Sequence, residues 1–172
     1  YAREFEALFG GQKEGLGQPV AFALEGVEGV AYFSPRGGRL AREALLKRLS
    51  EAQREVLVAA FVLTDREVLE ALLQARRRGA EVKVLLETRN LGTSREEALL
   101  EEGLEVRQDA NPYTMHHKVM LLAGTYVVTG SYNFSVRAHE VNNENLLVLK
   151  SPSLAERYRK EVLRLWEAGS PL

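Results

Sequence analysis

Apolar residues along the chain fall into two alternating patterns. Continuous runs of strand length contain few polar residues, and they cover 29–34, 55–63, 82–86, 104–107 and 144–149. Between them, apolar residues recur at helical spacing over 40–52, 64–78, 94–102 and 153–168. A run as apolar as 55–63 is typical of a strand buried on both faces of a parallel sheet. The alternation predicts an α/β sandwich with a mixed, mostly parallel sheet and an antiparallel portion.

The first 27 residues follow a different pattern. Tyr1 to Phe9 carry a helical apolar stripe that ends at Gly10-Gly11, and a Gly-rich connector follows, which we expect to be mobile or to lie on the surface. We therefore divide the chain into 1–27, a helix and connector, and 28–172, one domain.

Two features of the N-terminal segment leave its origin open. The spacing of Tyr1–Gly11 recurs in Tyr158–Gly169, either by chance or because the first helix closes a preceding copy of the same domain. The chain begins with Tyr rather than Met, so either an export signal was removed or the chain is part of a longer product.

Composition narrows the function classes. The 172 residues carry a net charge of −1, so any polyanion would be held by a local patch rather than by the whole surface. The absence of cysteine excludes thiolate nucleophiles and cysteine zinc ligands, and three histidines argue against a histidine-rich metal site. Abundant Arg and Glu with few Asn, Gln and Met favour a thermophile. No apolar run reaches membrane-spanning length.

The segment 115–133 carries the candidate chemistry. In an extended chain, His116 and Lys118 share one face and His117 lies on the other. After a turn at 123–125, a second strand brings Ser131 and Asn133 to the same end of a hairpin. A base or nucleophile, a cation, a hydroxyl and an amide suit a tetrahedral oxyanion such as phosphate. The alternative is a hairpin whose polar residues simply face water.

These residues resemble the motif of the phospholipase D superfamily, in which HxK, four further residues and an Asp are followed by GSxxN or GSxN. Here the motif reads His116-x-Lys118, then Gly130-Ser131-x-Asn133, with Glu144 further on. The resemblance extends over 28–167 through "YFSP", "LTD", "ALLQARRRGAEVKVLL" and "NNENLLVL". It implies a phospholipase D-like α-β-α sandwich and a phosphodiesterase.

The resemblance also implies roles for the motif residues. His116 attacks phosphorus to form a phosphohistidine, and an equivalent histidine of a second motif protonates the leaving group. Because one chain carries one motif, we expect either a homodimer or a missing N-terminal half with the second motif.

The other positions follow from the same chemistry. Lys118 and Asn133 hold the non-bridging oxygens, so neither metal nor cofactor is required. Glu144 accepts a hydrogen bond from the second ring nitrogen of His116. Ser131 helps that alignment or touches phosphate, and Gly130 lets the backbone pass close to the site.

One motif position departs from the family pattern. The Asp falls at position 123, where this chain has Ala123. In the turn after the strand, that acid would have an architectural or supporting role, so its loss is expected to weaken turnover rather than abolish it. Ala123 is a degenerate motif, an engineered change or a tolerated variant.

Other polar residues are weaker candidates. His117 is expected to be a packed or hydrogen-bonded structural histidine, and His139 to be exposed. Three basic residues near strand ends are candidates for lining a polyanion groove: Arg36, Arg39 and Arg89.

Three functions remain open. The leading interpretation is a metal-independent nuclease acting on DNA or RNA. The alternatives are a phospholipid phosphodiesterase forming half of a tandem chain, and a phosphate- or nucleic-acid-binding module made weakly active or inactive by Ala123. A bacterial, exported or periplasmic location is our expectation.

Overall fold

The computed structural model describes all 172 residues and contains one nine-stranded sheet. From one edge to the other, its strands are β1 (Val20–Leu24), β2 (Val27–Phe33), β8 (Asn145–Lys150), β7 (Tyr126–Gly130), β6 (Lys118–Leu122), β3 (Glu55–Ala60), β4 (Glu81–Leu86), β5 (Glu105–Gln108) and β9 (Ser170–Pro171).

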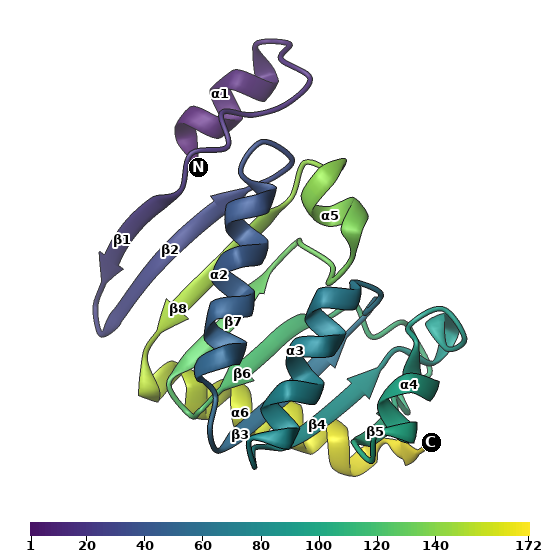
Figure 1. Ribbon diagram of the computed structural model, residues 1–172. Coiled ribbons are helices and arrows are strands. Elements are labelled where there is room, and N and C mark those ends of the chain that lie inside the picture. Colours follow the sequence, from purple (N-terminus) through teal and green to yellow (C-terminus); the bar gives the residue numbers. More distant parts are fainter.

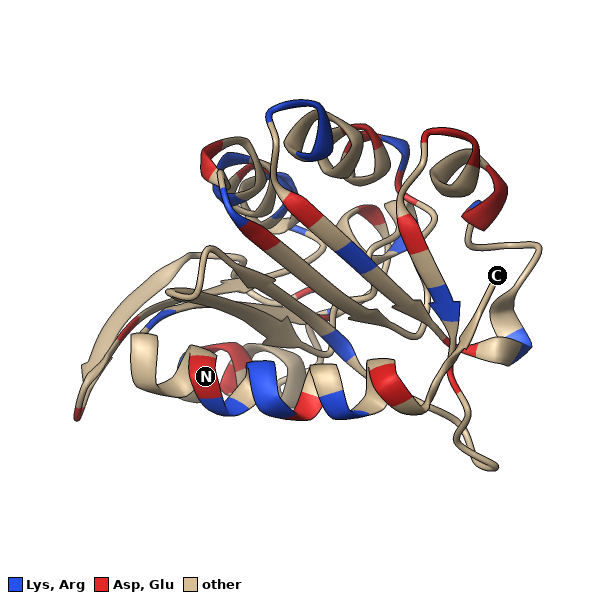
Figure 2. Ribbon diagram, turned by 90° about the horizontal axis from the view of Figure 1, so that it is seen from below, with Lys and Arg blue, Asp and Glu red and all other residues tan.

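Helices lie on both faces of this sheet (Figures 1 and 2). One face is covered by α2 (Gly38–Glu51), α3 (Arg66–Arg77) and α4 (Glu96–Glu101), and the other by α6 (Pro152–Ala168). Three shorter elements lie at the sheet edges and ends: α1 (Ala2–Phe9), the 3-10 turn η1 (Thr88–Asn90) and α5 (Val136–Glu140). Lys, Arg, Asp and Glu are interspersed on the helices (Figure 2). The predicted α/β sandwich with a mixed sheet is confirmed.

The proportion of parallel strands was predicted wrongly. Only the β3–β4 and β4–β5 pairs are parallel, and the other six pairs are antiparallel. Parallel neighbours need a crossover connection, which α3 and α4 supply. The hairpins β1–β2 and β6–β7 have short turns instead, and they insert antiparallel strands into one half of the sheet.

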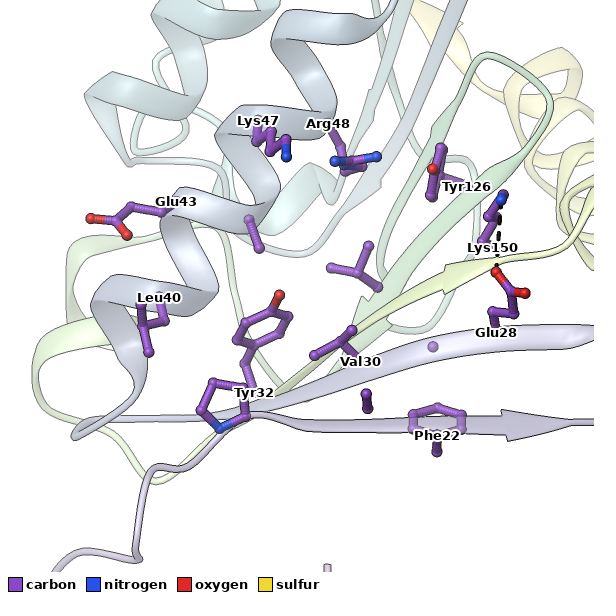
Figure 3. A pocket seen from close by; sticks show the side chains of 15 residues that line it. Phe22, Glu28, Val30, Tyr32, Leu40, Glu43, Lys47, Arg48, Tyr126 and Lys150 are labelled. Atoms are coloured by element: carbon purple, nitrogen blue, oxygen red, sulfur yellow. Dashed lines mark ion pairs between the residues drawn. The ribbon is translucent and has the colours of Figure 1, made fainter.

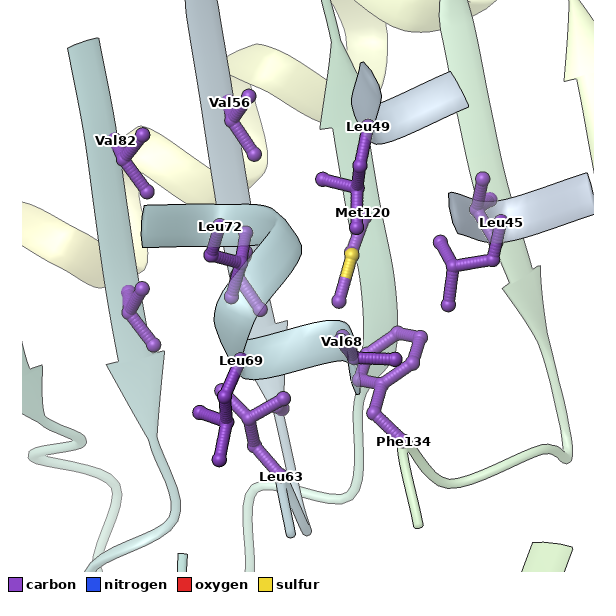
Figure 4. Close-up of a cluster of buried hydrophobic side chains, with 14 of the residues drawn as sticks. Leu45, Leu49, Val56, Leu63, Val68, Leu69, Leu72, Val82, Met120 and Phe134 are labelled. Carbon is purple, nitrogen blue, oxygen red and sulfur yellow. The ribbon is translucent and has the colours of Figure 1, made fainter. Parts of the chain in front are cut away.

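Two hydrophobic clusters hold the layers together. The larger one, of 26 buried residues, fills the space between the sheet and α2, α3 and α4 (Figure 4). The smaller one, of 11, lies between the sheet and α6. Strand β6 contributes to both, because Met120 belongs to the first cluster while Val119 and Leu121 belong to the second. The predicted alternation of faces in this strand is therefore confirmed.

The N-terminal segment is more ordered than the connector we expected. Its helix is confirmed as α1, but Val20–Leu24 form β1, an edge strand paired with β2. Four of the five β1 residues are exposed, so burial was no guide to this strand. Pairing with β2 supplies its hydrogen bonds instead.

Helix α4 also begins differently from the prediction. The predicted helix began at residue 94, but the cap position is Arg95, in a left-handed conformation with φ of 53°. The Ser94 hydroxyl is buried and accepts a hydrogen bond from the Leu63 amide at 3.5 Å. Asp65 caps α3, accepting from the Glu67 amide at 2.9 Å.

Candidate active site

The motif residues meet at one end of three inner strands of the sheet, where β7 ends and β6 and β8 begin. Lys118 is the first residue of β6, and Gly130 is the last of the antiparallel neighbour β7. Asn145 opens β8 on the other side of β7. His116 therefore comes just before a strand, and Ser131 and Asn133 come just after one.

His116 and Lys118 lie against the same aromatic ring, that of Phe61. The exposed His116 imidazole packs edge-on at a centroid distance of 4.4 Å. The Lys118 Nζ lies 4.9 Å from the Phe61 centroid and donates to the His116 carbonyl at 3.0 Å. This arrangement agrees with the predicted shared face. Phe61 lies inside the apolar run 55–63 and carries no signal of its own in the sequence; in the structure it comes directly after β3.

The environment of Lys118 changes its acidity. Its side chain is buried, with 6% of the residue exposed. Burial lowers the pKa of Lys118 because the charged ammonium loses solvation, and the carboxylate of Glu144 opposes this shift. The ammonium is thus a poorly hydrated cation beside an exposed imidazole, which suits an anionic ligand.

The loop after β7 is held tightly against β8. Gly130 has a φ of 141°, and a Cβ there would lie 2.3 Å from the Asn145 carbonyl oxygen, so only glycine fits. The Ser131 hydroxyl accepts hydrogen bonds from the Asn145 backbone and side-chain nitrogens at 3.0 and 3.3 Å. Ser131 therefore joins the loop to the start of β8.

Asn133, unlike Ser131, has no hydrogen-bond partner for its side chain. Its side chain makes no hydrogen bond within the protein, and its Oδ1 is buried without a partner. The side-chain nitrogen of Asn133 is consequently available to donate a hydrogen bond to an anion at this end of the strands.

Glu144 does not contact His116 in this structure. Its Oε1 accepts from the Asn142 side chain at 3.2 Å, and its backbone is joined to Ser34 on both sides. The predicted hydrogen bond to the His116 ring is absent because β7 separates β6 from β8, while His116 leans towards Phe61 on the β3 side. The nearby charge that Glu144 influences is Lys118.

Ala123 lies at the far end of β6 from the candidate site. With five residues in β6, it is about 16 Å from Lys118 at the usual rise of a strand. In the three-residue turn 123–125, Ala123 and Gly124 both have positive φ, 52° and 65°. An Asp at this position would favour the turn and could not reach a phosphate bound near Lys118.

A buried polar cluster, formed by Arg42, Asp65, Tyr132 and His139, lies behind the Ser131–Asn133 loop. The Asp65 Oδ2 is 3.7 Å from Arg42 Nη1 and 3.6 Å from His139 Nδ1. Burial and the Asp65 charge raise the pKa of Tyr132, whose hydroxyl has no hydrogen-bond partner. His139, predicted to be exposed, is only 4% exposed because α5 packs it towards α2.

The remaining polar candidates do not gather at the site. His117 was expected to be packed or hydrogen-bonded, but it is exposed and makes no side-chain hydrogen bond. It lies on the α6 side, where the hydrogen bond from Arg164 mainly, and His117 least, lower the pKa of Glu161. Each of the three arginines proposed to line a groove is held by a neighbour: Arg36 by Glu14, Arg39 by Glu43, and Arg89 by Thr114. They form no continuous basic groove.

The most voluminous of the main surface hollows lies away from the motif. It has a volume of about 690 Å³ and lies between α2 and strands β1, β2 and β8 (Figure 3). Tyr32 and Arg48 point into it, and Lys150 pairs with Glu28 at its rim. None of the motif residues lines this hollow.

A family model matches most of the chain. Residues 45–166 match the family model described as "Cardiolipin synthase, PLD-like domain". The chain belongs to the phospholipase D superfamily.

Individual members of the superfamily agree with this assignment. The chain is 35% identical over 129 residues to the mitochondrial cardiolipin hydrolase of Xenopus laevis, covering 74% of this chain and 61% of the relative. It is 32% identical over 128 residues to a phospholipase D of Rickettsia typhi, covering 73% and 62%. The chain thus spans about three fifths of the length of these relatives.

A solved member of the superfamily has the same fold. The phospholipase D family member Nuc from Salmonella typhimurium superimposes with a TM-score of 0.78 and 29% identity, covering 85% of this chain and 98% of Nuc. None of the helices in this chain is long and apolar enough to cross a bilayer.

Proposed function

We propose that the chain hydrolyses phosphodiesters without a metal, through a phosphohistidine formed on His116, and that its substrate is DNA or RNA. The observation that carries this proposal is the pairing of an exposed imidazole with a buried ammonium on one aromatic ring. The side-chain amide of Asn133, which has no partner, lies on the loop after β7, at the same end of the inner strands.

In the proposed reaction, the His116 imidazole attacks phosphorus while the bond from phosphorus to the leaving oxygen breaks. Lys118 and Asn133 stabilise the charge on the non-bridging oxygens. A second histidine gives its proton to the leaving oxygen, and later accepts a proton from the water that cleaves the phosphohistidine.

The second histidine must come from outside this site. His117 lies on the other side of the sheet and His139 is buried, so neither can face a substrate bound at His116. We propose that a second copy of the chain supplies its own His116 across a two-fold axis, or that a second motif in a longer chain does so.

The shape of the site favours a polymer over a single lipid. His116 is exposed at the end of the inner strand β6, where a long nucleic acid strand can pass without entering a pocket. The phospholipase D family member Nuc, matched over 98% of its length, shares the fold that presents this site.

One observation favours a phospholipid as a second candidate substrate. A groove of about 470 Å³ has Tyr1, Phe5, Leu8 and Phe33 along its apolar part and Glu144 among its polar lining residues. Such a surface could accommodate an acyl chain. The similarity to cardiolipin hydrolases is consistent with this possibility.

Cleavage assays in EDTA separate these functions. Single-stranded DNA, phospholipid vesicles and bis(4-nitrophenyl) phosphate are each incubated with the chain and with His116→Ala. We expect cleavage of DNA and of the aryl ester to persist in EDTA and to disappear in the variant. Cleavage that requires a divalent ion would contradict the histidine mechanism.

The same panel also identifies the other two functions. Preferential cleavage of vesicles would replace the nucleic acid by a phospholipid substrate. Retention of DNA that weakens with salt, without cleavage of any substrate, would show a binding module instead.

A further inference from the structure

Glu87 is a buried carboxylate that the proposed reaction does not use. It follows β4 directly, and only 1% of the residue is exposed. It forms no ion pair with any Lys, Arg or His in the protein. A buried carboxylate without a cation is unfavourable unless N–H donors satisfy both of its oxygens.

Both Glu87 oxygens have such donors, and the two donors belong to different segments. Oε1 accepts from the Arg89 amide at 3.1 Å and thereby caps the turn η1. Oε2 accepts from the Met115 amide at 2.5 Å, across 28 residues of sequence. The carboxylate therefore ties the end of β4 to the residue directly before His116.

The segment before His116 has few other supports from regular structure. Residues 109–117 belong to no strand or helix. The same turn η1 holds this segment twice more, since Thr88 donates to the Asp109 carbonyl at 2.6 Å and Arg89 donates to the Thr114 hydroxyl at 2.8 Å. Of these three contacts, the one made by Glu87 is nearest to the imidazole.

Met115 and His116 face opposite environments. The Met115 side chain is 2% exposed and belongs to the cluster beneath α6, whereas His116 is exposed beside Phe61. Holding the Met115 backbone therefore determines where the next residue leaves the protein surface. A nucleophile displaced by about 1 Å can lose about a hundredfold in rate.

We propose that Glu87 is a positioning residue for phosphodiester cleavage, which places the His116 nucleophile by holding the Met115 amide with its second oxygen. The inference rests on the proposed role of His116. A carboxylate is required because a glutamine has one acceptor oxygen and cannot serve both the Arg89 and the Met115 amides.

Glu96 provides a matched control. It is also buried, at 8% exposed, and its carboxylate caps a loop by accepting from the Gly92 amide, but it touches no motif segment. Glu87→Gln and Glu96→Gln thus remove the same negative charge from two buried carboxylates. Because the second Glu96 oxygen has no hydrogen-bond partner, only Glu87→Gln also loses an acceptor for a backbone N–H. Only the first is expected to affect the nucleophile.

The test compares steady-state and burst kinetics of both variants on bis(4-nitrophenyl) phosphate. In Glu87→Gln we expect kcat to fall about 10- to 100-fold with KM changed less than twofold, and the nitrophenol burst to slow equally. The Met115 amide resonance should also move upfield as its bond to a carboxylate is lost. Glu96→Gln should retain kcat within twofold.

Three outcomes are decisive. Retention of kcat in a folded Glu87→Gln protein would overturn the inference, and so would an equal loss in Glu96→Gln, which would show a general loss of stability. Full activity of His116→Ala would instead refute the proposed function, whatever the Glu87 variants do.

Discussion

Lys118, which we propose stabilises phosphate oxygens, lies in an environment that disfavours its charge. Burial lowers its pKa from the ordinary 10.5, and Glu144 only partly opposes the shift. Between the lowered value and 10.5, the unfolded chain binds more protons at this group than the folded protein does. The contribution of Lys118 to stability therefore rises with pH across that window.

The lowered pKa affects activity in the opposite direction: stability rises with pH across this window, whereas activity is expected to fall. Because only the protonated amine stabilises phosphate oxygens, we expect kcat/KM to decline at a pH below that of an ordinary lysine. Lys118→Arg should move the alkaline decline upwards by more than about one pH unit, since arginine remains charged, while lowering kcat about tenfold through its different shape. Rates on the aryl ester from pH 6 to 11 test this; an unchanged alkaline limb would count against Lys118.

Ala123 carries a conformational cost rather than a missing catalytic group. Alanine is disfavoured at a φ of 52°, whereas Asp and Asn tolerate the left-handed region. We expect Ala123→Asp and Ala123→Asn each to raise the free energy of unfolding by about 1 kcal/mol, measured with urea, and to leave kcat within twofold. A several-fold rise in kcat for Asp alone would show that the acid takes part in turnover.

The segments that follow β3 and β4 perform similar tasks. Asp65 caps α3 with one oxygen, and its other oxygen lies near His139 in the buried polar cluster. Glu87 caps η1 and holds Met115. The Phe134 carbonyl also accepts from the Thr64 and Asp65 amides, at 2.9 and 3.0 Å. Both halves of the motif are thus attached to the ends of the parallel strands.

Tyr132 should make this region sensitive to alkali. Its pKa is raised in the folded protein, so its contribution to stability is complete below pH 10 and is lost as the pH rises from 10 towards the folded value. At pH 11 this loss should be about 1.4 kcal/mol relative to pH 8. Urea unfolding of the chain and of Tyr132→Phe at both pH values should show that loss in the native protein alone. Equal losses in both proteins would refute the assignment.

The chain as a whole has only one histidine suitable for catalysis. If two copies share a site, both must carry His116. When His116→Ala protein is unfolded and refolded with native chain, activity should fall as the square of the native fraction. A linear decrease, or a monomer that is fully active by mass measurement, would contradict the shared site.

The two ends of the chain differ in how they use a similar helix. In α6, Val162 and Trp166 are each 5% exposed against the sheet. At the matching positions of α1, Phe5 and Phe9 are 64% and 82% exposed. The interpretation that α1 closes a preceding copy of the domain stays a prediction, but its apolar stripe is not buried within this chain.

The sequence by itself determined the longer helices and the buried strands, the alternation of faces in β6 and the motif, because each depends on local periodicity and residue chemistry; it did not show the exposed strand β1. Tertiary structure alone decided the pairing of strands, the separation of Glu144 from His116 by β7, and the burial of His139. It also brought Glu87 to Met115 across 28 residues. These contacts depend on which chain segments become neighbours in the sheet, and no spacing within one segment records that.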